Sequence, residues 1–372
     1  MSARKSARPS LSLPFRTPFR TPFRTPSRTS PRTPIGTSPR TSTPTPSTAS
    51  RLARAAASAA AATLLATALP LDAAAAPRDT EYAEYVALGD SWSADVALLT
   101  NVSTEHAPYA CFQSAWNYPK KVAKALGVTT LRDATCGSAT TEDFDKAQDI
   151  NYLGFIRGTN PRQFSRLSPT TDLVTIGIGG NDAGLASAAA SCFNLLPSLE
   201  LLPGLTLPAP LGGACKKGWV KRGVDEMSKR IAPVEGKVYD ALKRTHELAP
   251  DATVLVVDYL AGVPLDHGCY PYVQVNDGDL MWLGAKLKEI NDALARAVRR
   301  ADRDIADFDV RLVDTYSGSV GHDVCGLPGT KWVEGFVPLT ANPPGLAVPL
   351  HPNELGADHQ AATVLKTLEK SE

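Results

Sequence analysis

A serine and a histidine, far apart in the sequence, are the first candidates for chemistry. Gly89-Asp90-Ser91-Trp92 follows the short apolar segment Tyr85–Leu88, so Ser91 would present its hydroxyl at the end of a strand. His351-Pro352-Asn353 precedes a helical pattern, and imidazole is the natural base for a serine near neutral pH. Alone, the first segment also fits a helix-capping serine and the second a surface histidine. Together they predict a nucleophile, Ser91, with His351 as its general base.

Two further segments offer hydrogen-bond donors for a negatively charged oxygen. Cys136-Gly137-Ser138 contains a glycine whose N–H a substrate can approach closely, because no Cβ obstructs it. Gly179-Gly180-Asn181-Asp182 follows the apolar segment Leu173–Ile178, and the Asn181 amide is a neutral donor that can stabilise a tetrahedral oxyanion. In isolation each segment is simply a turn, where such residues are common. With the Ser91 N–H, Gly137 and Asn181 would complete an oxyanion hole.

The elements that would position these segments follow Tyr82 in the chain. Buried strands are expected at 85–88, 173–178, 253–259 and 310–314, and helices at 118–126, 280–300 and 353–368. Residues 220–248 have helical periodicity that Pro233 and Gly236 should break or kink. This alternation predicts an α/β fold, a three-layer α/β/α sandwich with a mainly parallel, flavodoxin-like central sheet. Sites in such sheets gather at the carboxyl ends of the strands.

The joint order of these segments resembles the SGNH (GDSL-like) hydrolase family, and is most similar to its secreted actinomycete esterases and lipases. Gly89-Asp90-Ser91 matches the family's nucleophile block, Gly137 its oxyanion glycine, Gly180-Asn181-Asp182 its asparagine block and His351-Pro352-Asn353 its histidine block. The likeness runs from about Tyr82 to Leu368. It implies a serine esterase or lipase that hydrolyses carboxylic esters through an acyl-enzyme on Ser91. No metal and no organic cofactor are expected.

The chain departs from the family pattern at one position. The family usually places an acid three residues before the histidine, and here that residue is Val348. We expect a Ser91–His351 dyad whose ring is held by a backbone carbonyl, as the resemblance to some actinomycete esterases of the family implies. The alternative is a carboxylate from elsewhere, with Asp90 and Asp182 nearest in motif terms.

The first 76 residues differ sharply in composition from the rest. Residues 1–50 form a basic Ser/Thr/Pro-rich leader that is expected to be disordered. Residues 51–76 combine two arginines, an apolar run and small residues, which predicts a signal peptide cleaved near 74–76. An uncleaved membrane anchor is the alternative, although the run is short and dominated by alanine. Residues 77–372 would then be a single SGNH hydrolase domain, secreted from the cell.

The six cysteines all lie after residue 110 and include no CxxC pair. Their even number behind an export signal favours three disulfides over a metal site. The family resemblance implies the pairs Cys111–Cys136, Cys192–Cys215 and Cys269–Cys325.

Charge excludes one class of partner. Eleven of the 39 Lys and Arg residues but only one of the 38 acids, Asp72, lie within residues 1–76, so the remainder carries a net charge near −9. Nucleic acid is therefore not expected as a partner, because its phosphates need basic contacts. The expected partner is a small-molecule or lipid ester, with transient contact to a lipid interface, and the protein is expected to be a monomer.

The substrate is less constrained by the sequence. A leucine-rich loop between Cys192 and Cys215 would form an apolar rim for an acyl chain, or would fold its leucines onto the body. Trp116 and Trp282 beside the cleft would favour a carbohydrate O-acetyl esterase, whereas a leucine-lined slot would favour lipid, including phospholipid. A non-catalytic secreted binding protein is the rival outside enzymes. His322, next to Cys325, is interpreted as structural.

Overall fold

The computed structural model describes residues 82–369 except 197–199, 203–204, 207–209 and 338. The expected leader (1–50), signal peptide (51–76) and cleavage site lie outside the described residues. Within the described part of the chain, no helix combines the length and apolar character needed to cross a membrane.

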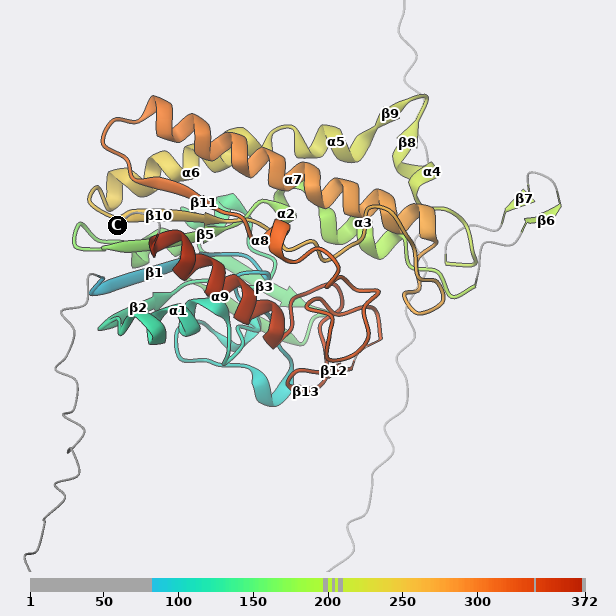
Figure 1. Cartoon of the computed structure of the whole chain (residues 1–372), viewed down its shortest axis with the longest axis horizontal. Coiled ribbons are helices and arrows are strands. Elements are labelled where there is room, and N and C mark those ends of the chain that lie inside the picture. The colour runs from blue at the N-terminus through green and yellow to red at the C-terminus, as the bar shows by residue number, and fades with distance from the viewer. Residues whose placement is uncertain (1–81, 197–199, 203–204, 207–209, 338, 370–372) are drawn as a thin grey trace, which may run out of the picture. The chain divides into compact units, whose positions relative to one another are not determined.

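A five-stranded parallel sheet forms the centre of this structure (Figure 1). Its strands in spatial order are β2 (Thr130–Asp133), β1 (Glu84–Gly89), β5 (Leu173–Gly177), β10 (Thr253–Val257) and β11 (Val310–Val313). This is the flavodoxin-like order, in which the chain starts inside the sheet and reverses its direction of travel at β1. Because β1 and β5 are neighbours at that reversal, a ligand cleft is expected beyond their carboxyl ends.

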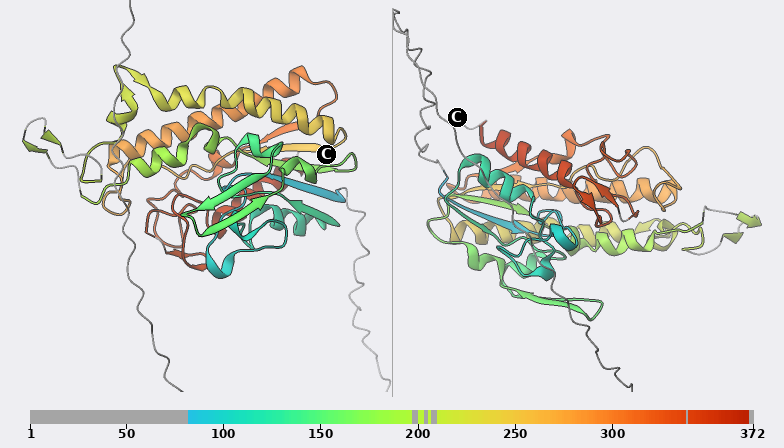
Figure 2. Two further views of the ribbon diagram at one scale, coloured as in Figure 1. Left: turned by 180° about the vertical axis from the view of Figure 1, so that it is seen from behind. Right: turned by 90° about the horizontal axis from the view of Figure 1, so that it is seen from below.

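Helices cover both faces of the sheet, and alternate strand residues pack under each layer. Tyr85 and Ala87 of β1 belong to one apolar cluster with residues of α1 (Tyr118–Leu126) and α9 (Glu354–Glu369). Val86 and Leu88 belong to another, with residues of α6 (Val234–Leu248) and α7 (Asp277–Asp304). Figures 1 and 2 show the two helix pairs on opposite sides of the sheet. The predicted three-layer α/β/α sandwich is confirmed.

The segment predicted to be helical over 220–248 is only partly so. A short hairpin is formed by β8 (Val220–Lys221) and β9 (Val224–Asp225). The next helix, α5 (Glu226–Ile231), is capped by the Asp225 carboxylate, which accepts from the N–H groups of Met227 and Ser228. Pro233 separates α5 from α6, as expected of a residue without an N–H. Gly236 lies inside α6 and does not interrupt it. The other expected strands and helices are confirmed to within a few residues.

Smaller elements complete the described structure. A hairpin, β3 (Gln148–Tyr152) with β4 (Ile156–Asn160), stands outside the sheet, and two short helices, α2 (Gly180–Ala183) and α3 (Leu185–Ser191), follow β5. The remaining short pieces are β6 (Glu200–Leu202), β7 (Leu205–Thr206), α4 (Lys216–Trp219), α8 (Thr315–Gly318), β12 (Thr340–Ala341) and β13 (Pro344–Gly345). Three disulfides join Cys111 to Cys136, Cys192 to Cys215 and Cys269 to Cys325, which are the pairs that the resemblance implies.

Candidate active site

Ser91 and His351 meet beyond the carboxyl end of β1. The Ser91 hydroxyl Oγ lies 2.8 Å from Nε2 of the His351 ring, although 260 residues separate the two in the chain. Ser91 lies in a tight turn that follows Gly89. A Cβ added at residue 89 would come within 2.5 Å of Ser93 Oγ and 2.6 Å of the Gly177 carbonyl oxygen. Glycine is therefore required at 89 to let β1 lead directly into this turn beside β5. The fold thus brings together the two residues that the sequence singled out first.

The second ring nitrogen of His351 contacts backbone, not a carboxylate. Its Nδ1 lies 2.8 Å from the carbonyl oxygen of Pro349. Because a carbonyl only accepts, Nδ1 carries the proton in this contact, which leaves Nε2 as an acceptor for the Ser91 hydroxyl. The two carboxylates considered as alternatives are bonded elsewhere. Asp90 accepts from Tyr259 and the Trp92 N–H, and Asp182 accepts from Thr141 and Lys237.

Burial shifts the pKa of two groups beside Ser91, those of His351 and Asp90. Loss of solvation lowers the pKa of His351 to about 4, against the opposing effect of the Pro349 carbonyl bond. His351 is therefore neutral at physiological pH, as a general base must be. Burial also raises the pKa of Asp90 to about 7, while the hydrogen bond from Tyr259 counteracts that rise.

The turn that carries His351 is held by Glu334. The Leu350 N–H donates to the Glu334 carbonyl at 2.8 Å, and the Glu334 N–H donates to the His351 carbonyl at 3.0 Å. The Glu334 side chain, 2% exposed, accepts from Asn353 Nδ2 at 2.8 Å and pairs with Lys331 Nζ at 2.7 Å. Leu350 has a φ of +60°, an unfavourable angle for leucine. The Glu334 contacts hold this strained residue, and with it the His351 ring, in place.

The expected oxyanion donors are arranged differently at one position. Asn181 lies on α2, and its Nδ2 donates one hydrogen to the Ala139 carbonyl at 2.9 Å, which leaves the second available. The Gly137 N–H, however, donates to the Cys111 carbonyl at 2.9 Å and is not free. The next residue, Ser138, has a φ of +63°, and its N–H has no hydrogen-bond partner among the described residues. The free backbone donor of this turn is thus Ser138, not Gly137.

Tyr259, which follows β10, links the turn of Ser91 to the helix of Asn181. Its hydroxyl donates to the Asp90 carboxylate at 2.5 Å and accepts from the Gly180 N–H at 2.8 Å. A Cβ on residue 180 would lie 3.0 Å from the same hydroxyl oxygen, so glycine at 180 allows this close approach. Pattern analysis of the sequence did not find Tyr259, because its role depends on contacts between three strand ends.

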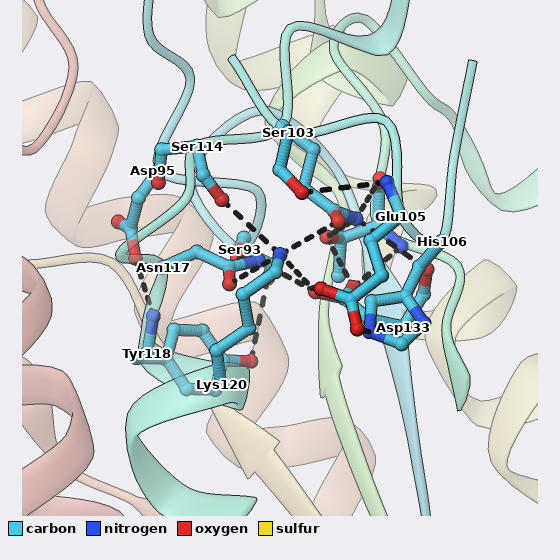
Figure 3. A network of polar contacts seen from close by, with 12 residues as sticks. Ser93, Asp95, Ser103, Glu105, His106, Ser114, Asn117, Tyr118, Lys120 and Asp133 are labelled. Atoms are coloured by element: carbon cyan, nitrogen blue, oxygen red, sulfur yellow. Dashed lines mark hydrogen bonds and ion pairs between the residues drawn. The ribbon is translucent and has the colours of Figure 1, made fainter. Parts of the chain in front are cut away.

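A mostly buried polar network that includes Ser93 and Asp95 lies beside the Ser91 turn (Figure 3). The Lys120 ammonium donates to Gln113 at 2.7 Å and Asn117 at 2.9 Å, and pairs with the Asp133 carboxylate at 3.3 Å. Asp133 ends β2, and its Oδ2 also accepts from Asn117 Nδ2 at 2.7 Å. Just after the Ser91 turn, the buried Asp95 carboxylate accepts from the first N–H of α1 at 2.8 Å. These bonds fix the turn relative to β2 and α1.

An apolar pocket of about 220 Å³ opens beside Ser91, His351 and Asn181. Its walls come mainly from α3 and α7, and include Leu185, Ala189, Leu280, Leu283, Leu287 and Phe336. The leucines of α7 are buried, so they form the inner wall. The helical spacing of these leucines predicted a buried face of α7. It did not predict that part of this face lines a pocket.

The features suggested as substrate determinants lie elsewhere. Leu195, Leu196 and Leu211 of the leucine-rich loop are exposed and do not line the pocket. Residues 197–199, 203–204 and 207–209 of that loop lie outside the described residues. Neither Trp116 nor Trp282 lines the pocket either.

His322 has the structural surroundings expected of it. Its ring stacks on Trp332 with centroids 3.8 Å apart, and its Nδ1 lies 2.7 Å from the Thr330 carbonyl.

Comparisons with known proteins identify the family of this chain. The sequence profile of the GDSL-like Lipase/Acylhydrolase family matches residues 87–359. Lipase 2 of Streptomyces coelicolor is 33% identical over 299 residues, which cover 79% of this chain and 89% of the relative. An esterase of Streptomyces scabiei is 29% identical, over 80% of this chain and 88% of its own. The crystal structure of an extracellular lipase from Streptomyces rimosus shares the fold, with a TM-score of 0.53, 21% identity, and coverage of 76% of this chain and 98% of that one. The chain is a member of the GDSL-like lipase/acylhydrolase family and a carboxylic ester hydrolase.

Proposed function

We propose that the protein is a secreted esterase or lipase that hydrolyses esters of apolar acyl chains through an acyl-enzyme on Ser91. The observation that carries this proposal is the 2.8 Å contact between Ser91 Oγ and His351 Nε2 at the mouth of an apolar pocket. A family assignment alone leaves the acyl group open. The leucines and alanines that make up much of the pocket wall favour an aliphatic chain over a sugar, which would need more polar partners than this wall offers.

In the proposed reaction, His351 Nε2 takes the Ser91 proton as Oγ attacks the ester carbonyl. The imidazolium that forms is stabilised by the Nδ1–H bond to the Pro349 carbonyl, which stands where a triad would have a carboxylate. Nε2–H then protonates the leaving alcohol. Water deacylates Ser91 by the same steps, and the acid is released.

The oxyanion that develops in each step would accept from the Ser91 N–H, the Asn181 amide and the Ser138 N–H. We place Ser138 here instead of Gly137 because only the Ser138 N–H is unengaged. Losing one such donor costs about 3–4 kcal/mol of transition-state stabilisation in comparable sites. Asn181→Ala should therefore lower kcat by roughly 10²- to 10³-fold with little change in KM.

Secretion is proposed from the basic and apolar segments before residue 77, and the three disulfides support it, because such bonds persist in oxidising compartments. Mass spectrometry of the exported protein should place its first residue near 75–77. An intact leader on the exported protein would contradict the proposed cleavage site.

The decisive experiment is hydrolysis of p-nitrophenyl acetate, butyrate and palmitate by the exported protein, beside its Ser91→Ala variant. Turnover that the substitution abolishes, with folding unchanged by circular dichroism, supports the proposed nucleophile. Undiminished turnover by Ser91→Ala would refute it. No turnover of any ester by the folded parent would favour a binding role.

A further inference from the structure

The loop at the end of the β3–β4 hairpin carries two solvent-exposed apolar side chains. Tyr152 and Ile156 are the last paired residues, and Leu153, Gly154 and Phe155 form the loop between them. The side chains at the tip are among the most exposed apolar ones described, with Leu153 88% and Phe155 72% accessible. Within the strand, by contrast, Ile150 is buried and packs into the core.

Folding does not explain the residues at this tip. Leu153 has a φ of +54°, a left-handed angle that asparagine or glycine adopts at lower cost than leucine. A leucine there adds backbone strain and exposes apolar surface to water without a packing contact in return. Paired exposed apolar side chains on a projecting loop are typical of a contact surface.

The hairpin is bound tightly to the turn that carries the free Ser138 N–H. At its base, Gln148 Nε2 donates to the Gly137 carbonyl at 2.8 Å. Near its tip, the Tyr152 hydroxyl lies 3.0 Å from Ser138 Oγ. Figure 2 shows the hairpin standing out from the body of the domain. Whatever the tip contacts is therefore held at a fixed position relative to the proposed oxyanion hole.

A cationic side chain accompanies the apolar tip. Arg157 is exposed, and its Nε donates to the Gly154 carbonyl at 2.9 Å, so its guanidinium is held against the loop. No acid lies within the tip segment 150–157. Two apolar side chains beside a guanidinium complement a phospholipid surface, where hydrocarbon lies under phosphate.

The tip is too small by itself to form a stable protein interface. A buried aromatic side chain contributes about 150–250 Å², so Leu153 and Phe155 together fall well below the roughly 800 Å² that each partner buries in a specific protein complex. A lipid surface needs no such area, because a few side chains suffice for reversible insertion.

We propose that the tip formed by Leu153, Phe155 and Arg157 inserts into phospholipid surfaces and holds the catalytic centre against them. This proposal rests on the proposed function and extends it. Docking would give an esterase with an apolar pocket access to esters that are insoluble in water. Soluble esters reach Ser91 without it.

The test compares Leu153→Ser/Phe155→Ser with the parent in two assays. Binding to sedimented vesicles of phosphatidylcholine with phosphatidylglycerol is measured in a Ser91→Ala background, so that the lipid stays intact. Hydrolysis of soluble p-nitrophenyl butyrate is measured with Ser91 present. The vesicle partition coefficient should fall at least tenfold, because burying one apolar side chain strengthens binding by roughly tenfold to a hundredfold. Butyrate turnover should stay within about twofold, as expected for substitutions remote from the pocket.

Two control variants test whether the loss of vesicle binding is specific to the tip. Val320→Ser/Leu327→Ser removes a pair of similar exposure, 66% and 70%, from other loops, and should leave binding unchanged. Arg157→Gln should weaken binding to vesicles with phosphatidylglycerol more than to pure phosphatidylcholine, and added salt should narrow that difference.

Three outcomes would overturn the proposal: unchanged vesicle binding by the tip variant, an equal loss in the control pair, or a parallel loss of butyrate turnover. Conversion of a dimer to a monomer by the tip variant would assign the tip to self-association instead. If the parent hydrolyses no ester while Ser91→Ala still binds vesicles through the tip, the proposed function fails and the docking stands.

Discussion

Filling the apolar pocket should change which acyl chains the enzyme accepts. Ala189 is 5% exposed and borders the pocket of about 220 Å³ between α3 and α7, so Ala189→Phe would place a ring inside that space. Each buried methylene is worth about 0.8 kcal/mol, or roughly fourfold in kcat/KM. Octanoate has six more methylenes than acetate. The preference for octanoate over acetate in kcat/KM therefore has an upper limit of about 5 kcal/mol, or roughly three-thousandfold.

The assay is kcat/KM for p-nitrophenyl acetate, butyrate, hexanoate and octanoate, all below their solubility limits. The parent should prefer the longer chains, whereas Ala189→Phe should flatten the series, with the octanoate-to-acetate ratio reduced at least about tenfold. Acetate turnover should change less than about threefold, because its methyl group does not reach the pocket wall. Ser187→Phe, on the exposed side of the same helix, is the matched control and should leave the series unchanged. An equal fall for every ester would refute the reasoning, since it would show that the ring disturbs Ser91 and not the acyl chain.

The remaining predictions concern the proposed dyad and the residues that hold His351. Burial lowers the pKa of His351 to about 4, so the neutral base persists in mild acid. The value of kcat/KM should therefore stay level from pH 8 to about pH 5 and decline below it. A decline of kcat/KM with its midpoint near pH 6.5 would contradict a buried His351 ring. Asp182→Asn should slow kcat less than about tenfold, whereas a carboxylate that orients the histidine would be worth about 10⁴-fold, so stopped-flow turnover separates the two. Glu334→Ala should lower the free energy of unfolding in urea by about 3–5 kcal/mol, because Lys331 is left buried without its partner. Thr340→Val removes the hydroxyl bond to the same carboxylate and the bond from the Asn342 N–H but leaves the Lys331 pair intact, and should cost about 1–2 kcal/mol.

Much of the fold was predictable because strands and helices follow local periodicity. The long amphipathic pattern of α7, the β-branched run of β10 and the glycine after α1 are each visible within one segment. The hairpin at Val220–Asp225 was not, since its residues continue a helical periodicity that the cap at Asp225 interrupts. The β3–β4 hairpin also escaped prediction, because it packs outside the sheet and ends in apolar residues that no turn rule expects.

By itself, the sequence was enough to single out the candidate residues for the chemistry. Ser91, Asn181 and His351 stand next to strand or helix ends, and a motif of a few residues is enough to identify each of them. Tertiary structure alone decided how they are assisted. The His351 ring contacts the Pro349 carbonyl and not a carboxylate. The Gly137 N–H donates to the Cys111 carbonyl, while the Ser138 N–H has no partner among the described residues, and α3 and α7 border the pocket. These outcomes depend on distances between segments far apart in the chain, and only the packed fold sets those distances.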